Sequence, residues 1–233
     1  NISNFHPMKG PMTTQTLRGL STLDPFHWRG DRTNFLHFNV AFSPLLGGSA
    51  LSAADMAAYR DFINTIAFEP NPNQNLNRTL PALHDGGNPT LGRNAYIGTN
   101  YATLLGVIQL NCNTCHGVNK GTEGGFTPAA ALQESQDMKV PHLRNIYQKL
   151  RFNNAPGAQS LLGFGLAHDG PDAGLTNFLS RAVFGTLASD TFQKQNIAAF
   201  VQCFDTGTAP AVGYTRTITA ANVNSASVSN DWS

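Results

Sequence analysis

The feature that most constrains this chain of 233 residues is a pair of cysteines, Cys112 and Cys115, followed directly by His116. C-x-x-C-H is the attachment signature of a c-type haem. Both thiols add to the haem vinyl groups as thioethers, and the two-residue spacer sets them at the separation of those vinyls. The adjacent histidine then ligates the iron as its proximal ligand. The motif therefore predicts one covalent haem c, held by Cys112, Cys115 and His116.

Paired cysteines also occur in zinc sites and in redox dithiols. A zinc site would need a second pair of thiolate or imidazole ligands at short spacing, and Cys203 is the only cysteine left. A dithiol oxidoreductase would need a βαβ context, which the sequence does not indicate. We interpret Cys203 as a small apolar residue on the buried face of the last helix. Haem c is thus favoured over both alternatives.

Composition limits the partners of the chain. Apolar residues make up 41% of the sequence and charged residues 12%, and the formal net charge is +1. This balance gives no broad electrostatic field to hold nucleic acid or an anionic membrane. No run approaches the roughly 18 consecutive apolar residues of a membrane-spanning helix. We therefore predict no nucleic-acid partner and no membrane span.

Covalent attachment of haem c takes place outside the cytoplasm, which predicts a periplasmic or extracellular protein. The low charge and the abundance of Asn, Thr, Ser and Gly agree with export. The N-terminus lacks the basic-then-apolar pattern of a signal peptide, so we expect the export signal to lie outside this chain.

Hydrophobic periodicity predicts helices over residues 53–67 and 190–204. Ser52 begins the first of these with a capping pattern, and Pro70 ends it. A third apolar stretch, residues 101–110, is predicted to form a helix that leads into the cysteine pair. Strand signals are almost absent, so the chain is predicted to be mainly α.

The other segments are irregular in sequence. Residues 1–50 are rich in Pro, Gly and Phe, which indicates an irregular segment wrapped over another part of the fold. Residues 69–100 are dense in Asn, Pro and Gly and are predicted to form an ordered loop or a linker. Residues 211–233 form a tail, predicted either as a strand or as a mobile end.

A weak internal repeat relates the two halves of the chain. Three segments of the first half recur in the same order in the second half. The second copy is preceded by the cysteine pair, whereas the first copy begins almost at residue 1. We therefore expect the chain to start partway through its first unit. The paired segments are residues 14–20 with 140–146, 26–31 with 166–170, and 34–42 with 177–184.

The segments around the cysteine motif resemble a known family. Downstream of the motif, three stretches resemble the C-terminal haem domain of di-haem cytochrome c peroxidase-like proteins: Lys139–Asn145 (KVPHLRN), Gly163–Gly170 (GFGLAHDG) and Ala199–Asp205 (AFVQCFD). The stretch from residues 6–12 through residues 26–32 resembles the later half of the N-terminal haem domain in a subgroup of large members of that family. The resemblance covers about residues 1–68 and 105–213.

This resemblance implies two cytochrome c folds in tandem. It also implies that this chain is a fragment of a larger member of the family. Residues 1–94 would be a partial N-terminal cytochrome c-like unit, irregular and partly helical, without its own haem motif. Residues 95–210 would be the cytochrome c domain with the motif, and 211–233 a tail. Relatives carry two C-x-x-C-H motifs and this chain has one, so the first either precedes residue 1 or has been lost.

The identity of the sixth iron ligand separates electron transfer from peroxide or oxygen chemistry. His168 is the first candidate for the distal ligand, because a loop could fold it over the haem. Met138 is the second candidate, and an open position is the third. His37 lies ten residues after His27 in the first unit, so the repeat makes it a possible ligand of a first-unit haem.

The sequence therefore favours a c-type cytochrome that transfers electrons. Its partner would be a redox protein or a neighbouring haem subunit. One alternative is a haem peroxidase or oxygenase of the di-haem peroxidase type. Another is a haem-bearing structural subunit of an extracellular assembly. The sequence lacks the D-x-D-x-D-G pattern of a calcium-binding loop, so it does not predict a calcium site.

Overall fold

The computed structural model describes residues 10–104, 108–132, 134–151, 163–209 and 216–229. Its α-helices are α1 (Ala53–Asn64), α2 (Pro89–Gly98), α3 (Cys112–Cys115), α4 (Ala129–Leu132), α5 (Leu175–Phe178), α6 (Thr191–Gln202) and α7 (Ala226–Ser229). Its 3-10 helices are η2 (Phe35–Ala41), η3 (Ile146–Lys149) and η4 (Ala182–Ser189).

The strands form two small antiparallel sheets of two strands each. One sheet pairs β1 (Ala102–Leu104) with β2 (Ile108–Leu110), and the other pairs β3 (Phe126–Thr127) with β4 (Met138–Lys139). The predicted mainly α class is therefore confirmed. None of the described helices is both long and apolar enough to cross a membrane.

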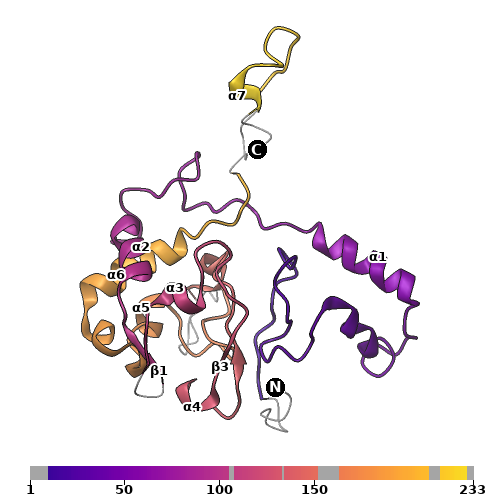
Figure 1. Cartoon of the computed structure of the whole chain (residues 1–233), viewed down its shortest axis with the longest axis horizontal. Coiled ribbons are helices and arrows are strands. Elements are labelled where there is room, and N and C mark those ends of the chain that lie inside the picture. Colours follow the sequence, from indigo (N-terminus) through magenta and orange to yellow (C-terminus); the bar gives the residue numbers. More distant parts are fainter. Residues whose placement is uncertain (1–9, 105–107, 133, 152–162, 210–215, 230–233) are drawn as a thin grey trace, which may run out of the picture.

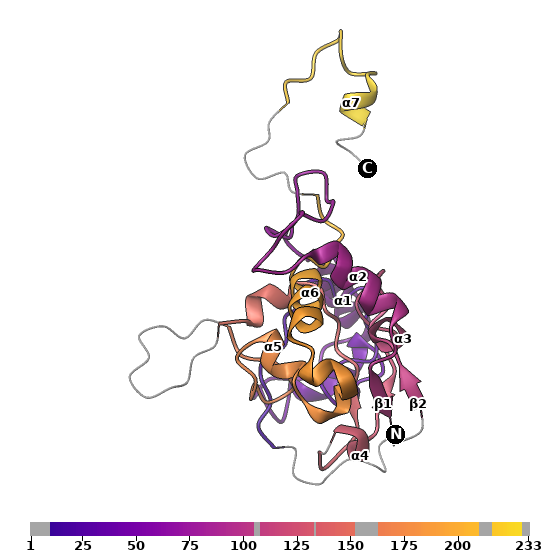
Figure 2. The same ribbon diagram turned by 90° about the vertical axis from the view of Figure 1, so that its left-hand side faces the viewer.

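The main contact of the fold is the packing of α2 against α6, which lie side by side in both views (Figures 1 and 2). Gly92 makes this contact close, because a Cβ added to it would lie 1.9 Å from the carbonyl oxygen of Asn196. Asn88 begins α2 and fixes the same crossing, since its backbone N–H donates to the side-chain oxygen of Asn196 at 2.9 Å. One turn beyond Gly92, the ring of Tyr96 packs on Phe200 of α6 at 5.1 Å between centroids.

The chain has two apolar clusters. The larger one gathers side chains from α2, α5, α6, η3 and η4, and Cys112 packs against it. The smaller one gathers Met56 and Ile63 of α1 with Leu23, Phe26 and Phe35. In Figure 1, α1 lies on the opposite side of the molecule from α2 and α6. The smaller cluster thus draws on residues 20–66 and the larger one on residues 80–204.

Two turns of similar form belong to the internal repeat. Residues 26–32 and 166–172 are each closed by an antiparallel bridge between their first and last residues. Both turns have positive φ at the second position, 68° at His27 and 64° at Ala167. They also share a glycine of positive φ at the fifth position. The conformation of the two turns agrees with the repeat in the sequence.

Thr13 connects these two turns. Its backbone N–H donates to the carbonyl of His168 at 2.7 Å, and its carbonyl accepts from the indole N–H of Trp28 at 2.8 Å. Lys139 adds a second connection, because its ammonium group donates to the carbonyls of Leu23 and Pro25. The two halves are therefore joined by directional bonds as well as by packing.

The structure confirms two predicted helices and corrects two other predictions. The helices predicted over residues 53–67 and 190–204 form as α1 and α6. The helix predicted over 101–110 is wrong, since β1 and β2 pair there, and a short apolar run does not separate helix from strand by periodicity. The loop predicted over 69–100 is wrong where α2 forms.

Glycine content hides α2 in the sequence. Gly92 and Gly98 lower its intrinsic helix propensity, yet Asn88 followed by Pro89 is a helix start signal. The predicted boundary between residues 94 and 95 falls inside this helix. In the tail, α7 forms over its last described residues, and those residues contain no strand.

We predict that Gly92→Ala destabilises the fold, because the added methyl group would collide with the backbone of α6. Overpacking of this kind costs about 1–3 kcal/mol or more. Gly98→Ala is the matched control on the same helix, since a Cβ there meets no atom within 4 Å. Urea unfolding followed by circular dichroism measures both variants. Equal stability of the two variants would contradict this account of the α2–α6 contact.

Candidate functional site

The cysteine motif lies on α3, a single helical turn. Asn111 caps it, because its side-chain oxygen accepts from the backbone N–H of Thr114 at 3.0 Å. The backbone N–H of His116 donates to the carbonyl of Cys112 at 2.8 Å, which closes the turn. Residues three and four apart on a helix share a face. The local fold therefore brings Cys112, Cys115 and His116 together, as the sequence predicts for the attachment of one group.

The imidazole of His116 is held by two backbone carbonyls. Its Nδ1 lies 2.9 Å from the oxygen of Pro141 and 3.1 Å from that of Gly121. Two acceptors at Nδ1 require the proton on that nitrogen, which leaves the lone pair of Nε2 available. Burial lowers the pKa of His116, although the two carbonyls act in the opposite direction. The group is thus a neutral imidazole with Nε2 ready to bind a metal.

Two residues fix the backbone around this histidine. The buried hydroxyl of Tyr96 donates to the carbonyl of His116, which ties α2 to the end of α3. Gly121 has a φ of +77°, and a Cβ there would lie 2.5 Å from the backbone nitrogen of Leu143. Glycine therefore lets the loop after the motif approach the segment that carries Pro141. Sequence analysis missed Tyr96, which lies in the segment predicted as a loop.

The two thiols do not resemble a redox dithiol. Both are free, and burial raises the pKa of Cys112 to about 11 and also raises that of Cys115. Reactive dithiols have a lowered cysteine pKa instead. Among the described residues, no candidate metal cluster includes either cysteine. A zinc ion at this pair would therefore lack the further protein ligands of a structural zinc site. Both alternatives to haem attachment are disfavoured by this geometry.

A group of basic residues follows Pro141. Burial, together with Lys149, Arg144 and Lys139, lowers the pKa of His142 to about 3. The Nε and Nη2 atoms of Arg144 are buried without a hydrogen-bond partner, and so is the hydroxyl of Tyr147. Unpartnered buried donors are costly unless an acceptor binds them. Donors of this kind suit an anionic group.

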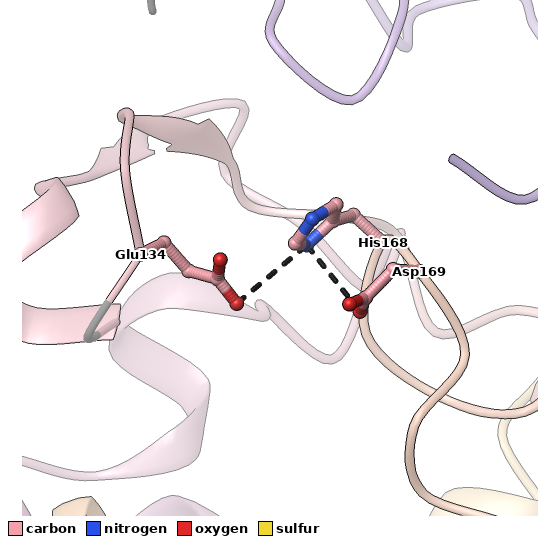
Figure 3. Close-up of side chains that lie close together, drawn as sticks. All are labelled: Glu134, His168 and Asp169. Atoms are coloured by element: carbon pink, nitrogen blue, oxygen red, sulfur yellow. Dashed lines mark ion pairs between the residues drawn. The ribbon is translucent and has the colours of Figure 1, made fainter. Parts of the chain in front are cut away.

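The predicted distal ligands lie in three separate places. Met138 is a buried residue of β4, paired with Thr127 of β3, whereas His37 is exposed on η2. His168 lies between Glu134 and Asp169, as Figure 3 shows. In the described part of the chain, no hydrogen bond or ion pair joins any of the three to His116. Their assignment as iron ligands stays a prediction.

Comparison with known proteins shows one distant similarity in fold. No protein-family model matches the chain, and no curated protein matches it. A chain of hydrazine synthase from Kuenenia stuttgartiensis, in a structure pressurised with xenon, aligns with a TM-score of 0.52 and 14% identity. The alignment covers 82% of this chain and 72% of that chain. At this identity the likeness shows the fold alone, and the resemblance to di-haem peroxidases is not confirmed.

We predict that Tyr96→Phe destabilises the protein, since the carbonyl of His116 then loses its donor inside the fold. Leaving one buried acceptor unpaired costs about 1–3 kcal/mol. Tyr59→Phe is the matched control, because Tyr59 is 38% exposed and its ring contacts Phe35 and Phe42. Its expected change is within about 0.5 kcal/mol. Urea unfolding measures both, and an unchanged midpoint for Tyr96→Phe would show that this hydrogen bond does not support the site.

Proposed function

We propose that this chain is a c-type cytochrome that binds one covalent haem and transfers electrons. The observation that carries the proposal is the pair of backbone carbonyls at Nδ1 of His116, with two free thiols on the helical turn before it. A histidine that ligates a metal usually donates its other ring N–H to such an acceptor. The proposal therefore rests on a structural arrangement and a sequence motif that agree.

Each residue of the site has a defined task in this proposal. Cys112 and Cys115 form the thioethers, and His116 presents Nε2 to the iron. The carbonyl of Pro141 fixes the ring and makes its nitrogen more basic, which favours the ferric state. When bound, the haem supplies one-electron chemistry. The larger apolar cluster packs against Cys112.

The basic residues after Pro141 fit the carboxylates of the same group. Arg144 offers two unpartnered nitrogens and Tyr147 an unpartnered hydroxyl. Lys149 lies two residues after Tyr147 in η3, and burial lowers the pKa of its ammonium group to about 8. A bound anion would stabilise the charged form of this group. We propose that these residues would hold the carboxylates of the haem, while Cys112 and Cys115 would hold it covalently.

The sixth iron position is proposed to be filled, first by His168 and second by Met138. Two strong axial ligands suit an electron carrier, whereas an open position suits peroxide chemistry. A low-spin bis-histidine spectrum of the ferric protein would support His168. A near-infrared methionine band would support Met138. High-spin iron that turns over peroxide would contradict the electron-carrier proposal and support a peroxidase.

Location and partner follow from the same chemistry. Because haem c is attached outside the cytoplasm, we propose a periplasmic or extracellular protein that exchanges electrons with a redox protein or a neighbouring haem subunit. A chain of hydrazine synthase shares the fold, and this likeness is consistent with a redox role.

The test is to express and export the chain in cells that contain a haem c attachment system, and then to measure covalent haem. We expect one haem per chain in the denatured protein, measured by the pyridine haemochrome spectrum and by mass. The double variant Cys112→Ala/Cys115→Ala loses all covalent haem. Cys203→Ala is the control and keeps it, because that thiol is buried in the core with its Sγ 3.3 Å from the carbonyl of Asn73. Wild-type protein without covalent haem would overturn the proposal.

A further inference from the structure

Three side chains outside the haem-attachment site converge on one point. Figure 3 shows the ring of His168 between the carboxylates of Glu134 and Asp169. Glu134 comes from the segment after α4, whereas His168 and Asp169 are adjacent in the 166–172 turn. One ligand atom from each residue lies within 4.8 Å of the others. The fold thus assembles one imidazole and two carboxylates from two separate segments.

The distances within this group suit a shared cation better than direct hydrogen bonds. Nδ1 of His168 lies 3.9 Å from Oε1 of Glu134 and 3.8 Å from Oδ1 of Asp169, beyond hydrogen-bonding range. A metal bound at about 2.0–2.2 Å to nitrogen and oxygen ligands fits in this space after small rotations of the side chains. Among the described residues, neither carboxylate forms an ion pair with a lysine or arginine.

The backbone holds these side chains in place. The carbonyl of His168 accepts two bonds from Thr13, from its N–H at 2.7 Å and its hydroxyl at 3.2 Å. The bridge between Leu166 and Asp172 closes the turn. On the other segment, the backbone N–H of Glu134 donates to the carbonyl of Ala129 at 3.0 Å. The ligand atoms are therefore presented by a supported framework.

The repeated turn in the first half provides an internal comparison. Trp28 and Arg29 occupy the positions of His168 and Asp169 there. Its acidic residue, Asp31, bonds to His27 at 2.8 Å and faces Arg29 and Arg32 within 4.0 Å. The first turn thus neutralises its carboxylate with its own cations. The second turn has the same form and lacks those cations, which leaves its negative charge for an external ion.

We infer that Glu134, His168 and Asp169 bind a divalent first-row transition metal ion, with water in the remaining positions. The imidazole separates this class from calcium and magnesium, which prefer oxygen ligands alone. The ion would join the segment after α4 to the 166–172 turn, next to the contact with Thr13. It would use Nδ1 of His168, so this inference competes with the assignment of His168 as the sixth iron ligand and leaves Met138 as the candidate for that position.

The test is calorimetric titration of the haem-loaded chain with ZnCl₂ after removal of loosely bound metals by a chelator. We expect one saturable site per chain and a melting temperature that rises with Zn²⁺ concentration. Glu134→Gln, Asp169→Asn and His168→Ala should each weaken the affinity at least about tenfold. Asp61→Asn is the control, since this exposed carboxylate lies on α1, and it should leave the affinity unchanged.

X-ray absorption of bound Co²⁺ at the cobalt edge provides a second measurement on the unchanged chain. The haem iron does not obscure it, and it does not depend on the folding of any variant. We expect a cobalt spectrum with nitrogen and oxygen ligation that ZnCl₂ abolishes. Absence of a saturable site, or variants that bind like wild type, would overturn the inference. Tighter binding of CaCl₂ than of ZnCl₂ would overturn it too. So would a His168→Ala variant that keeps Zn²⁺ affinity and loses a low-spin haem band.

Discussion

The hydrogen bond from Nδ1 of His116 to the carbonyl of Pro141 is the interaction on which the site depends. It connects the cysteine turn to a segment 25 residues further along the chain. Gly121 makes the connection possible, because a side chain there would collide with the backbone of Leu143. The bond decides which ring nitrogen keeps its proton, and hence which one is left to bind a metal. The packing of the loop at Gly121 therefore determines which nitrogen of His116 is available for binding.

Helices α2 and α6 also position His116, through its backbone carbonyl. Gly92 lets α2 approach α6 closely, and that approach buries Tyr96 against Phe200. The hydroxyl of Tyr96 then reaches the carbonyl of His116. The first half of the chain adds a second contact surface, joined through Thr13 and Lys139. Thr13 bonds to both repeated turns, one neutralised by its own cations and the other acidic.

Local patterns predicted the parts of the structure that depend on neighbours in sequence. The motif at Cys112, Cys115 and His116, and the periodic helices α1 and α6, are of this kind. Helix α2 escaped prediction because Gly92 serves packing against α6, which composition does not reveal. The group of Glu134 and His168 escaped for a related reason, since its members come from distant segments. Long-range contacts decide these features, and spacing alone does not contain them.

The most direct test of the central claim is diffraction from crystals of the haem-loaded chain, with anomalous data collected at the iron edge. The account predicts one iron peak bonded to Nε2 of His116, with Nδ1 still within hydrogen-bonding distance of the Pro141 carbonyl. Electron density should join the haem to Cys112 and Cys115. An iron bound through Nδ1, or no iron beside His116, would contradict the account.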